Sequence, residues 1–398
     1  MRNITGSPVE NSDFFDRPAD LARLQREFRS NANVLLTAPR RVGKTSLVLR
    51  LCSLEKGAGR HAVYANVEGC HDELAFAEKL VDALNECGFH PELMNRVALC
   101  FRRARQALSG MKVGAAGVDM EMGEAEDPDH STVGRALESI FRKIENSDTA
   151  VLLAIDEMPE LLFALLRQEH GQDRVSRLLH WLRSLRQTYR RNIRWIFLGS
   201  IGLDSFVEER NLGKTINDLT PMSLEALTEE EAHAFLIALG ESNNLPLREA
   251  ERSAIIAKVG WPLPHHLQIV FHALVDTGVR KSGTSSVEAA FAELLKPANL
   301  SRFDTWRQRL DEQFSTPDAT TAKDILRHLC QHPEGRSREQ MLNALMSTRQ
   351  NADAAAVEDV LARMLLILQR DGYILEKNGS YAFRSFLLRE YWNCREVR

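Results

Sequence analysis

Short apolar runs and segments with helical spacing alternate over the first 220 residues. Apolar runs at 33–38, 61–67, 150–155 and 194–200 predict buried strands, and a further strand is expected near 214–219. Helical spacing fills most of the sequence between them, at 44–53, 72–88, 91–108, 131–146, 159–168 and 172–191. Strands that alternate with helices, and that are apolar enough to be buried on both faces, are typical of a parallel α/β sheet. A short hairpin and an acidic loop are expected over 110–130.

After about residue 222 the pattern becomes helical, with helices expected at 229–240, 248–258, 263–277 and 287–296. From about 302 the order is three helices and then two short strands around Asn378-Gly379, a pair typical of a hairpin turn. Three helices and such a hairpin predict a winged helix. We therefore expect an α/β core at 1–222, a helical lid domain at 223–300 and a winged-helix domain at 301–398.

Composition indicates an ordinary globular protein, with 44% hydrophobic residues, 27% charged residues and a net charge of -4 in 398 residues. The sequence offers neither a signal peptide nor an apolar stretch long enough for a transmembrane helix, so no membrane association is expected. Six cysteines form no metal-binding pattern and are interpreted as reduced thiols of a cytoplasmic protein.

One motif in the core carries specific chemistry. Residues 38–45, Ala-Pro-Arg-Arg-Val-Gly-Lys-Thr, fit the phosphate-loop pattern except that Ala38 replaces its first glycine. Backbone N–H groups of such a loop converge on phosphate oxygens at the start of the following helix. Lys44 is expected to bridge the terminal phosphates of ATP, and the Thr45 hydroxyl to bind Mg²⁺. The nucleotide-binding residues expected here are Ala38, Pro39, Arg40, Arg41, Val42, Gly43, Lys44, Thr45 and Ser46.

A second motif supplies the acids that a phosphate loop requires. The run AVLLAIDE puts Asp156 and Glu157 at the carboxyl end of a buried strand. Asp156 is expected to hold the magnesium shell together with Thr45, and Glu157 to orient the attacking water. The two motifs together predict a Mg²⁺-dependent ATPase. Two solvated acids at a strand end, and a chain that binds ATP only as a scaffold, are the alternatives.

The chain resembles the archaeal-type ATPases, which lie near the STAND ATPases and the origin-recognition branch of the AAA+ class. The resemblance is carried by FFDRPADLARL at 14–24, APRRVGKTSL, LAIDEMPELL, LHWLRSLRQ, IRWIFLGSIGL, the segment from 213 to 236, GWPLPHHLQIV and YAFRSFLLREYW. It implies a P-loop NTPase sheet with a lid and a C-terminal winged helix. It also implies nucleotide contacts at Arg17 and Pro262, a sensor role for Ser200, and an arginine finger at Arg183 or Arg186. The alternative for Arg17 is a salt bridge of the entry helix, and for Pro262 a proline at a helix start. For Arg183 and Arg186 it is a solvated basic helix face.

The predicted winged helix does not have the charge of a strong DNA binder. Residues 301–398 hold 15 Lys and Arg against 14 Asp and Glu, and the expected third helix carries Glu358 and Asp359 near its start. A helix that reads a DNA groove usually offers Arg, Lys, Asn or Gln there. Packing against the ATPase core or a partner is therefore favoured over DNA.

Two functions remain in competition. The first is an ATP-driven AAA+/STAND-like switch that controls the lid and winged helix and engages further copies of itself or a separate effector protein; the resemblance suggests roles in phage defence or mobile-element control. The alternative is a DNA-binding ATPase similar to replication initiators or transposition regulators. ATP, ADP and Mg²⁺ are the expected ligands in both.

Overall fold

The computed structural model describes residues 1–9, 13–15, 17–88, 90–108, 130–148, 150–199, 203–277, 283–349 and 353–397. The chain divides into two compact units. The α/β unit comprises Arg17–Thr37 and Lys44–Ser223, and the C-terminal unit comprises Met1–Asp16, Ala38–Gly43 and Leu224–Arg398. The predicted phosphate loop is thus grouped with the C-terminal unit, although the strand before it and the helix after it belong to the α/β unit.

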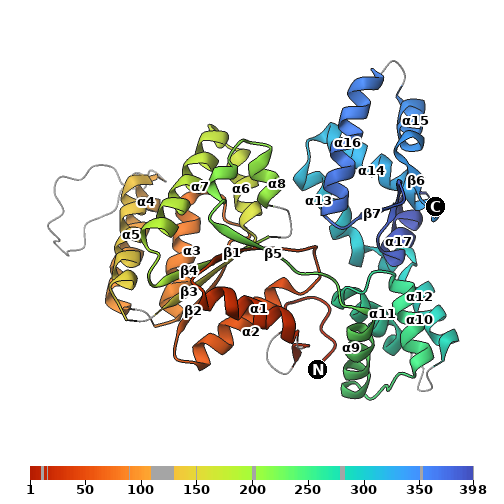
Figure 1. Ribbon diagram of the computed structural model, residues 1–398, viewed down its shortest axis with the longest axis horizontal. Helices are drawn as coiled ribbons and strands as arrows, with labels where there is room; N and C mark the ends of the chain where they lie inside the picture. Colours follow the sequence, from red (N-terminus) through yellow and green to blue (C-terminus); the bar gives the residue numbers. More distant parts are fainter. Residues whose placement is uncertain are drawn as a thin grey trace. The chain divides into compact units, whose positions relative to one another are not determined.

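Within the described part of the α/β unit, five parallel strands form one sheet in the order β2-β3-β4-β1-β5 (Figure 1). The strands are β1 (Asn33–Thr37), β2 (His61–Asn66), β3 (Val151–Asp156), β4 (Ile193–Gly199) and β5 (Leu219–Ser223). The helices are α1 (Pro18–Arg29), α2 (Lys44–Gly57), α3 (Glu73–Glu86), α4 (Pro91–Leu108), α5 (His130–Glu145), α6 (Met158–Leu166), α7 (Gly171–Thr188) and α8 (Leu203–Glu208).

Helices cover both faces of this sheet, which explains why its central strands are apolar throughout. Alternate residues of the strands join α3 to α8 in one apolar core, while α2 packs on the other face with α1 beside it (Figure 1). Every residue of β3 and β4 is buried. The predicted P-loop type of parallel sheet is therefore confirmed.

The strand expected near 214–219 is wrong in position. Gly213–Thr215 form a 3₁₀ turn, and the strand β5 begins only at Leu219. The turn is fixed by the Thr215 hydroxyl, which donates to the carbonyl of Leu212 at 2.7 Å. The hairpin and acidic loop expected over 110–130 lie, apart from residue 130, outside the described residues.

In the part of the C-terminal unit that follows Leu224, four helices come first: α9 (Glu229–Ser242), α10 (Glu249–Val259), α11 (Pro264–Asp276) and α12 (Thr284–Leu294). After α13 (Asp304–Gln313) come α14 (Thr316–Cys330), β6 (Arg336–Ser337), α15 (Arg338–Thr348), α16 (Ala354–Arg370), β7 (Ile374–Lys377), β8 (Ser380–Phe383) and α17 (Phe386–Glu396). The order from α14 to β8 is consistent with the winged helix that the sequence predicts. None of the helices among the described residues is long and apolar enough to cross a membrane.

The wing illustrates how local sequence determines local structure. β7 and β8 are antiparallel, and Lys377 pairs with Ser380 across a two-residue turn. Both turn residues, Asn378 and Gly379, have positive φ, at 53° and 75°. Two positive φ values are what a type I′ hairpin turn needs, and Asn-Gly adopts them at low cost.

Candidate nucleotide site

The predicted phosphate loop, Ala38–Gly43, connects β1 to α2. Its positive φ angles fall on Arg41, at 69°, and Gly43, at 99°. Ala38 is not among the residues with positive φ, so the missing glycine costs the loop no backbone strain there. No atom lies within 4 Å of a Cβ placed on Gly43. Gly43 is therefore required for its backbone angle and not for space.

The α/β unit brings three side chains together at the carboxyl end of β3. Thr45 and Asp156 are predicted site residues, and Tyr64 is not. The Thr45 hydroxyl, at the start of α2, donates to Asp156 Oδ2 at 2.7 Å. The Tyr64 hydroxyl, on β2, donates to the same oxygen at 2.8 Å. Burial, followed by the charge of Asp156, raises the pKa of Tyr64, so its hydroxyl stays protonated and donates. Asp156 itself is only 2% exposed.

Glu157 holds an unusual backbone conformation next to this cluster. It has φ 58° and ψ 36°, the left-handed region, and it is the residue before α6. Its N–H donates to Asp156 Oδ1 at 2.9 Å. A non-glycine residue in this region costs about 1–2 kcal/mol. Such strain is concentrated at functional sites, and here it turns the backbone N–H of Glu157 back toward Asp156.

The oxygens at this end of β3 fit a magnesium ion. The Thr45 hydroxyl and the Asp156 carboxylate are hard oxygen ligands, the kind that Mg²⁺ prefers. Among the described residues there is no group of three or more His, Cys, Asp or Glu that could enclose a metal. Mg²⁺ in nucleotide enzymes is usually held by one or two protein oxygens, by water and by the substrate phosphates. Thr45 and Asp156 match that arrangement.

Within the C-terminal unit, the phosphate loop packs against two segments that are far away in sequence. A Cβ placed on Gly372, just after α16, would lie 2.5 Å from Trp261 Cη2 and 3.4 Å from Pro39 Cβ. The Arg384 guanidinium also contacts Trp261, 4.4 Å from the centre of its ring. Pro39 of the loop, Trp261 of the lid and the turn at Gly372 thus form one close-packed group, which we name the loop contact.

The predicted lid and the predicted winged helix contact each other beside the loop contact. The Ser385 hydroxyl donates to the carbonyl of Val259 at 2.8 Å, and both groups are buried. A Cβ on Gly260 would lie 2.6 Å from the backbone nitrogen of Phe386. Two of the motifs that carry the family resemblance, at 260–270 and 381–392, therefore contact each other.

His266, at the start of α11, is fully buried, and neither of its ring nitrogens has a hydrogen-bond partner in the described chain. Burial first, and then the charge of Arg41, lowers the pKa of His266 to about 3. The same causes lower the pKa of His265 well below its ordinary value. Arg41 is close enough to act on both histidines, which puts this side of the loop beside the start of α11.

His266 predicts a pH dependence of stability. The unfolded chain takes up a proton near pH 6.5 but the folded chain only near pH 3, so stability falls as the pH drops below 6.5. The loss expected between pH 7 and pH 5 is about 2 kcal/mol from this group. Urea denaturation of wild type and His266→Leu at both pH values measures it. The variant should lose the dependence due to His266 and be more stable than wild type at pH 5; equal pH slopes for the two proteins would contradict the assignment.

The structure places the other predicted residues as follows. Lys44 and Ser46 are buried in the first turn of α2. Arg17 precedes α1 and pairs with Asp20 at 3.0 Å, the salt bridge considered as the alternative for this residue. Pro262 lies between α10 and α11, and its carbonyl accepts from Leu227 N; the proline that starts a helix is Pro264. Ser200 lies outside the described residues.

Both predicted finger arginines bond to the segment that precedes β5. Arg186 is 4% exposed and makes two hydrogen bonds of 2.8 Å to the Asp218 carboxylate. It also donates to the carbonyl of Thr215, at 2.5 Å, and Arg183 donates to the carbonyl of Lys214. In this chain Arg186 thus holds its own segment in place, and a finger role for either residue stays a prediction.

Tyr64 and the loop contact were not found by sequence reasoning. Tyr64 reaches Asp156 only because β2 and β3 pair in parallel with Asn66 opposite Asp156. That register is not visible in a local pattern. Trp261 and Gly372 lie in separate domains of the predicted organisation, and no local pattern indicates that they meet.

No protein-family model matches the chain, and no curated protein matches its sequence. Solved structures do. The Walker-type ATPase PABY2304 of Pyrococcus abyssi is similar with a TM-score of 0.65 and 16% identity, over 99% of this chain and 100% of the other. The ORC2 protein of Aeropyrum pernix, solved with ADPNP and ADP, is similar with a TM-score of 0.59 and 13% identity, over 99% and 97%. The chain therefore has the fold of the Walker-type ATPases, which the family resemblance predicts.

Proposed function

We propose that this chain binds ATP with Mg²⁺ and hydrolyses it. The observation that carries the proposal is the 2.7 Å hydrogen bond between Thr45 and Asp156, which joins the helix after the phosphate loop to the acidic end of β3. In this proposal, the backbone N–H groups of 40–46 and the Lys44 ammonium bind the phosphates. Glu157 orients the water and accepts its proton. Bound magnesium would neutralise charge on the phosphate oxygens.

Thr45→Ala tests this assignment. Removing a hydroxyl that ligates Mg²⁺ should raise the Mg²⁺ concentration needed for half-maximal turnover at least about tenfold. Thr45→Ser, which keeps the hydroxyl, is the matched control and should stay close to wild type. Phosphate release measured across a MgCl₂ titration gives the answer. A wild-type Mg²⁺ response in Thr45→Ala would contradict the proposed ligand.

The cycle of ATP binding and hydrolysis is proposed to act on the C-terminal unit. The loop contact supports this, since Pro39 of the phosphate loop packs with Trp261 of the lid and the turn at Gly372 after α16. A ligand shifts a conformational equilibrium only through contacts that differ between the two states. Phosphates bound by the loop would bear directly on its packing with the lid and winged helix.

A DNA-binding ATPase is the second candidate, and the fold likeness to the Aeropyrum pernix ORC2 protein favours this initiator-like function over a STAND-like switch. Association with further copies or with an effector protein, and a role in phage defence, remain predictions from the sequence resemblance alone. Salt-sensitive binding of a labelled duplex is the measurement that tests the DNA candidate.

A further inference from the structure

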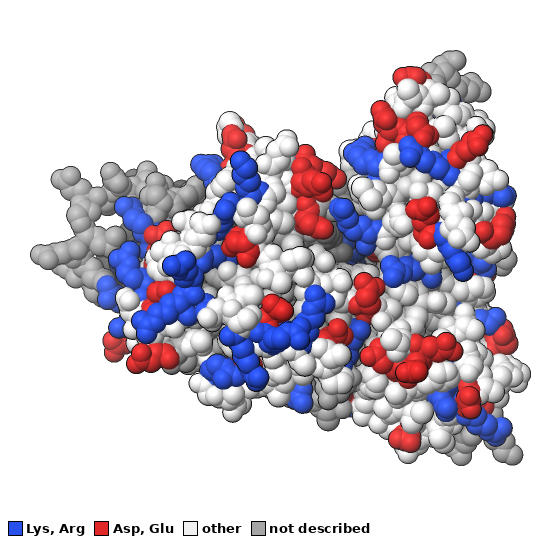
Figure 2. Space-filling view, in the orientation of Figure 1, with Lys and Arg blue, Asp and Glu red and all other residues white. Residues whose placement is uncertain are grey.

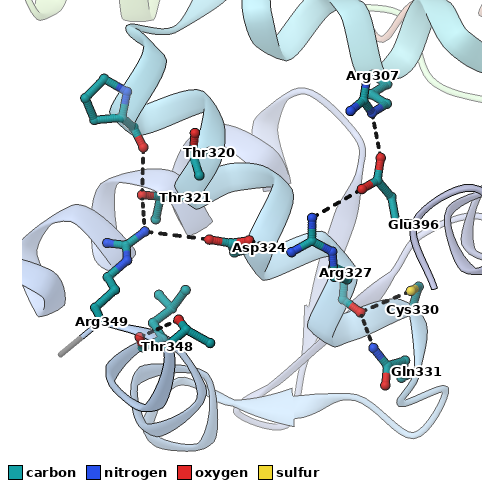
Figure 3. A network of polar contacts seen from close by, with 12 residues as sticks. Arg307, Thr320, Thr321, Asp324, Arg327, Cys330, Gln331, Thr348, Arg349 and Glu396 are labelled. Carbon is teal, nitrogen blue, oxygen red and sulfur yellow. Dashed lines mark hydrogen bonds and ion pairs between the residues drawn. The ribbon is translucent and has the colours of Figure 1, made fainter.

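The cations of the winged helix are largely committed to acids of the same domain. Arg338 pairs with Glu358 at 2.5 Å and Arg363 with Asp318 at 2.8 Å. Figure 3 shows Arg307 and Arg327 meeting at Glu396, and Arg349 bonded to Thr321 and Asp324. Two exposed cations lie on α16, Arg363, which is paired with Asp318, and Arg370 at its last residue; its other exposed residues are Ala354, Ala355, Ala356, Asp359 and Leu366, which offer little to a DNA groove. If the chain binds DNA, another surface has to supply the positive charge.

Such a surface exists in the α/β unit. Five exposed cations stand just before three neighbouring strands, and we name them the basic edge: Arg29 ends α1, Arg142 and Lys143 lie in the last turn of α5, and Arg190 and Arg191 follow α7. No acidic side chain pairs with any of the five in the described ranges. Figure 2 shows Lys and Arg side chains gathered over the region of α5 and α7.

The sheet topology puts these cations side by side. Arg142 and Lys143 lead into β3, Arg190 and Arg191 into β4, and Arg29 into β1, and these three strands are neighbours in the order β3-β4-β1. Neighbouring strands are about 4.8 Å apart, so the cation-bearing segments start along one short edge of the sheet. The strands of this sheet are all parallel. The basic edge is therefore at the opposite end of the sheet from Asp156, which ends β3.

A hydrogen-bond network holds the segments of the basic edge in fixed positions. The buried Arg194 side chain donates to the carbonyls of Arg190, at 2.6 Å, and Arg191, at 3.1 Å. It also donates to Asn31 Oδ1, at 3.1 Å, just after the end of α1. Burial lowers the pKa of Arg194, and the hydrogen bonds to these oxygens compensate for the burial of its guanidinium. Arg194 thus ties the end of α1 to the turn that carries Arg190 and Arg191.

Glu145 and Asn192 tie the same turn to the end of α5. The Glu145 carboxylate accepts from the backbone nitrogens of Arg191, at 2.8 Å, and Asn192, at 3.0 Å. The Asn192 side-chain amide donates to the carbonyls of Ile144, at 3.2 Å, and Glu145, at 3.1 Å. The Glu145 carboxylate is thus held by backbone N–H groups, and within the part of the chain that the structure describes it forms no ion pair with any of the five cations. A row of exposed cations without acidic partners, carried on segments held in place, suits contact with a phosphate backbone.

We propose that the basic edge, and not the winged helix, is the surface that binds the phosphate backbone of duplex DNA. The inference rests on the second candidate function, DNA binding, and identifies the surface that contacts the DNA. Because the five side chains are simple cations at a sheet edge, with no element projecting into a groove, they position the duplex without reading its sequence.

Paired substitutions distinguish the two surfaces. Arg190→Gln with Arg191→Gln removes two cations of the basic edge, and Arg338→Gln with Arg363→Gln removes two from the winged helix. Fluorescence anisotropy of a labelled duplex is measured between 50 and 200 mM KCl. Two lost phosphate contacts should lower the slope of log K against log salt by about two, and weaken binding about tenfold or more at the lower salt. The winged-helix pair should leave both quantities unchanged.

Each other outcome has a definite meaning. Loss of binding in the winged-helix pair alone would overturn the inference. So would equal slopes of log K against log salt in wild type and both double variants. Neither result would contradict DNA binding itself. Absence of salt-sensitive binding in wild type removes the DNA candidate and the inference together, while the proposed ATPase activity is untouched. Circular dichroism and ATP turnover like those of wild type show that the basic-edge pair is folded, since the network uses the backbone and not the side chains of Arg190 and Arg191.

Discussion

Glu157→Gln should lower ATP turnover by about 10²- to 10⁴-fold, the contribution of a positioned general base. Gln keeps the shape of Glu157 but cannot accept a proton from water. The hydrogen bond from the Glu157 backbone to Asp156 Oδ1 does not involve the side chain and should persist. ATP affinity should therefore stay within a few-fold of wild type. Single-turnover phosphate release and binding of a fluorescent ATP analogue measure the two quantities separately.

Glu157→Gly separates chemistry from backbone strain at the same position. Because Glu157 holds φ at 58°, glycine should stabilise the fold by up to about 1 kcal/mol while turnover stays as low as in Glu157→Gln. Glu169→Gln, at a side chain that is 92% exposed, is the matched control for loss of a carboxylate. Turnover of Glu157→Gln within tenfold of wild type would rule out Glu157 as the base.

Local patterns predict the elements on which the candidate site is built. The apolar run before Ala38 and the helical spacing after Lys44 predict β1 and α2, and the run that ends in Asp156 predicts β3. Asn378-Gly379 predicts the wing turn, because its required φ angles depend on those two residues alone. These features are set within a few residues of sequence, where side-chain size and backbone freedom decide the conformation.

Features set by distant partners are not predicted. The segment before β5 is shaped by Arg186, which is 29 residues from the Thr215 carbonyl it binds. The strand β5 itself contains Pro221, a residue that argues against a strand when the sequence is considered alone. The proline is tolerated because β5 lies at the edge of the sheet and pairs only with β1. The Tyr64 hydroxyl on Asp156 depends on strand register, and the loop contact depends on how separate elements of the C-terminal unit pack.

The network around Arg194 is a further feature that local sequence does not predict. The sequence of 190–194 contains three arginines, a pattern that indicates only a basic segment. Burial divides them: Arg194 is 4% exposed and bonds to backbone carbonyls, while Arg190 and Arg191 are exposed. One cation therefore serves the fold and two are available to a ligand, a division that depends on the end of α1 and the end of α5.

The loop contact predicts that Gly372→Ala strongly destabilises the C-terminal unit. Gly372 has φ 84°, which by itself costs alanine about 1 kcal/mol. The added Cβ would also lie 2.5 Å and 2.9 Å from two atoms of the Trp261 ring. Overpacking of this kind costs a further 1–3 kcal/mol or so. The total loss of stability should be about 2–4 kcal/mol, measured by urea denaturation.

Gly379→Ala is the matched control, since Gly379 has φ 75° but no atom within 4 Å of an added Cβ. The stability of Gly379→Ala should fall only by the cost of the backbone conformation, about 1 kcal/mol. Trp261→Ala removes the ring that the new methyl group meets, so Gly372→Ala should cost less in that background than in wild type. Because Pro39 belongs to the same contact, Gly372→Ala should also weaken binding of the fluorescent ATP analogue, while Gly379→Ala should not. Equal losses of stability in the two glycine variants, with unchanged nucleotide affinity, would show that the loop contact does not connect the phosphate loop to the winged helix.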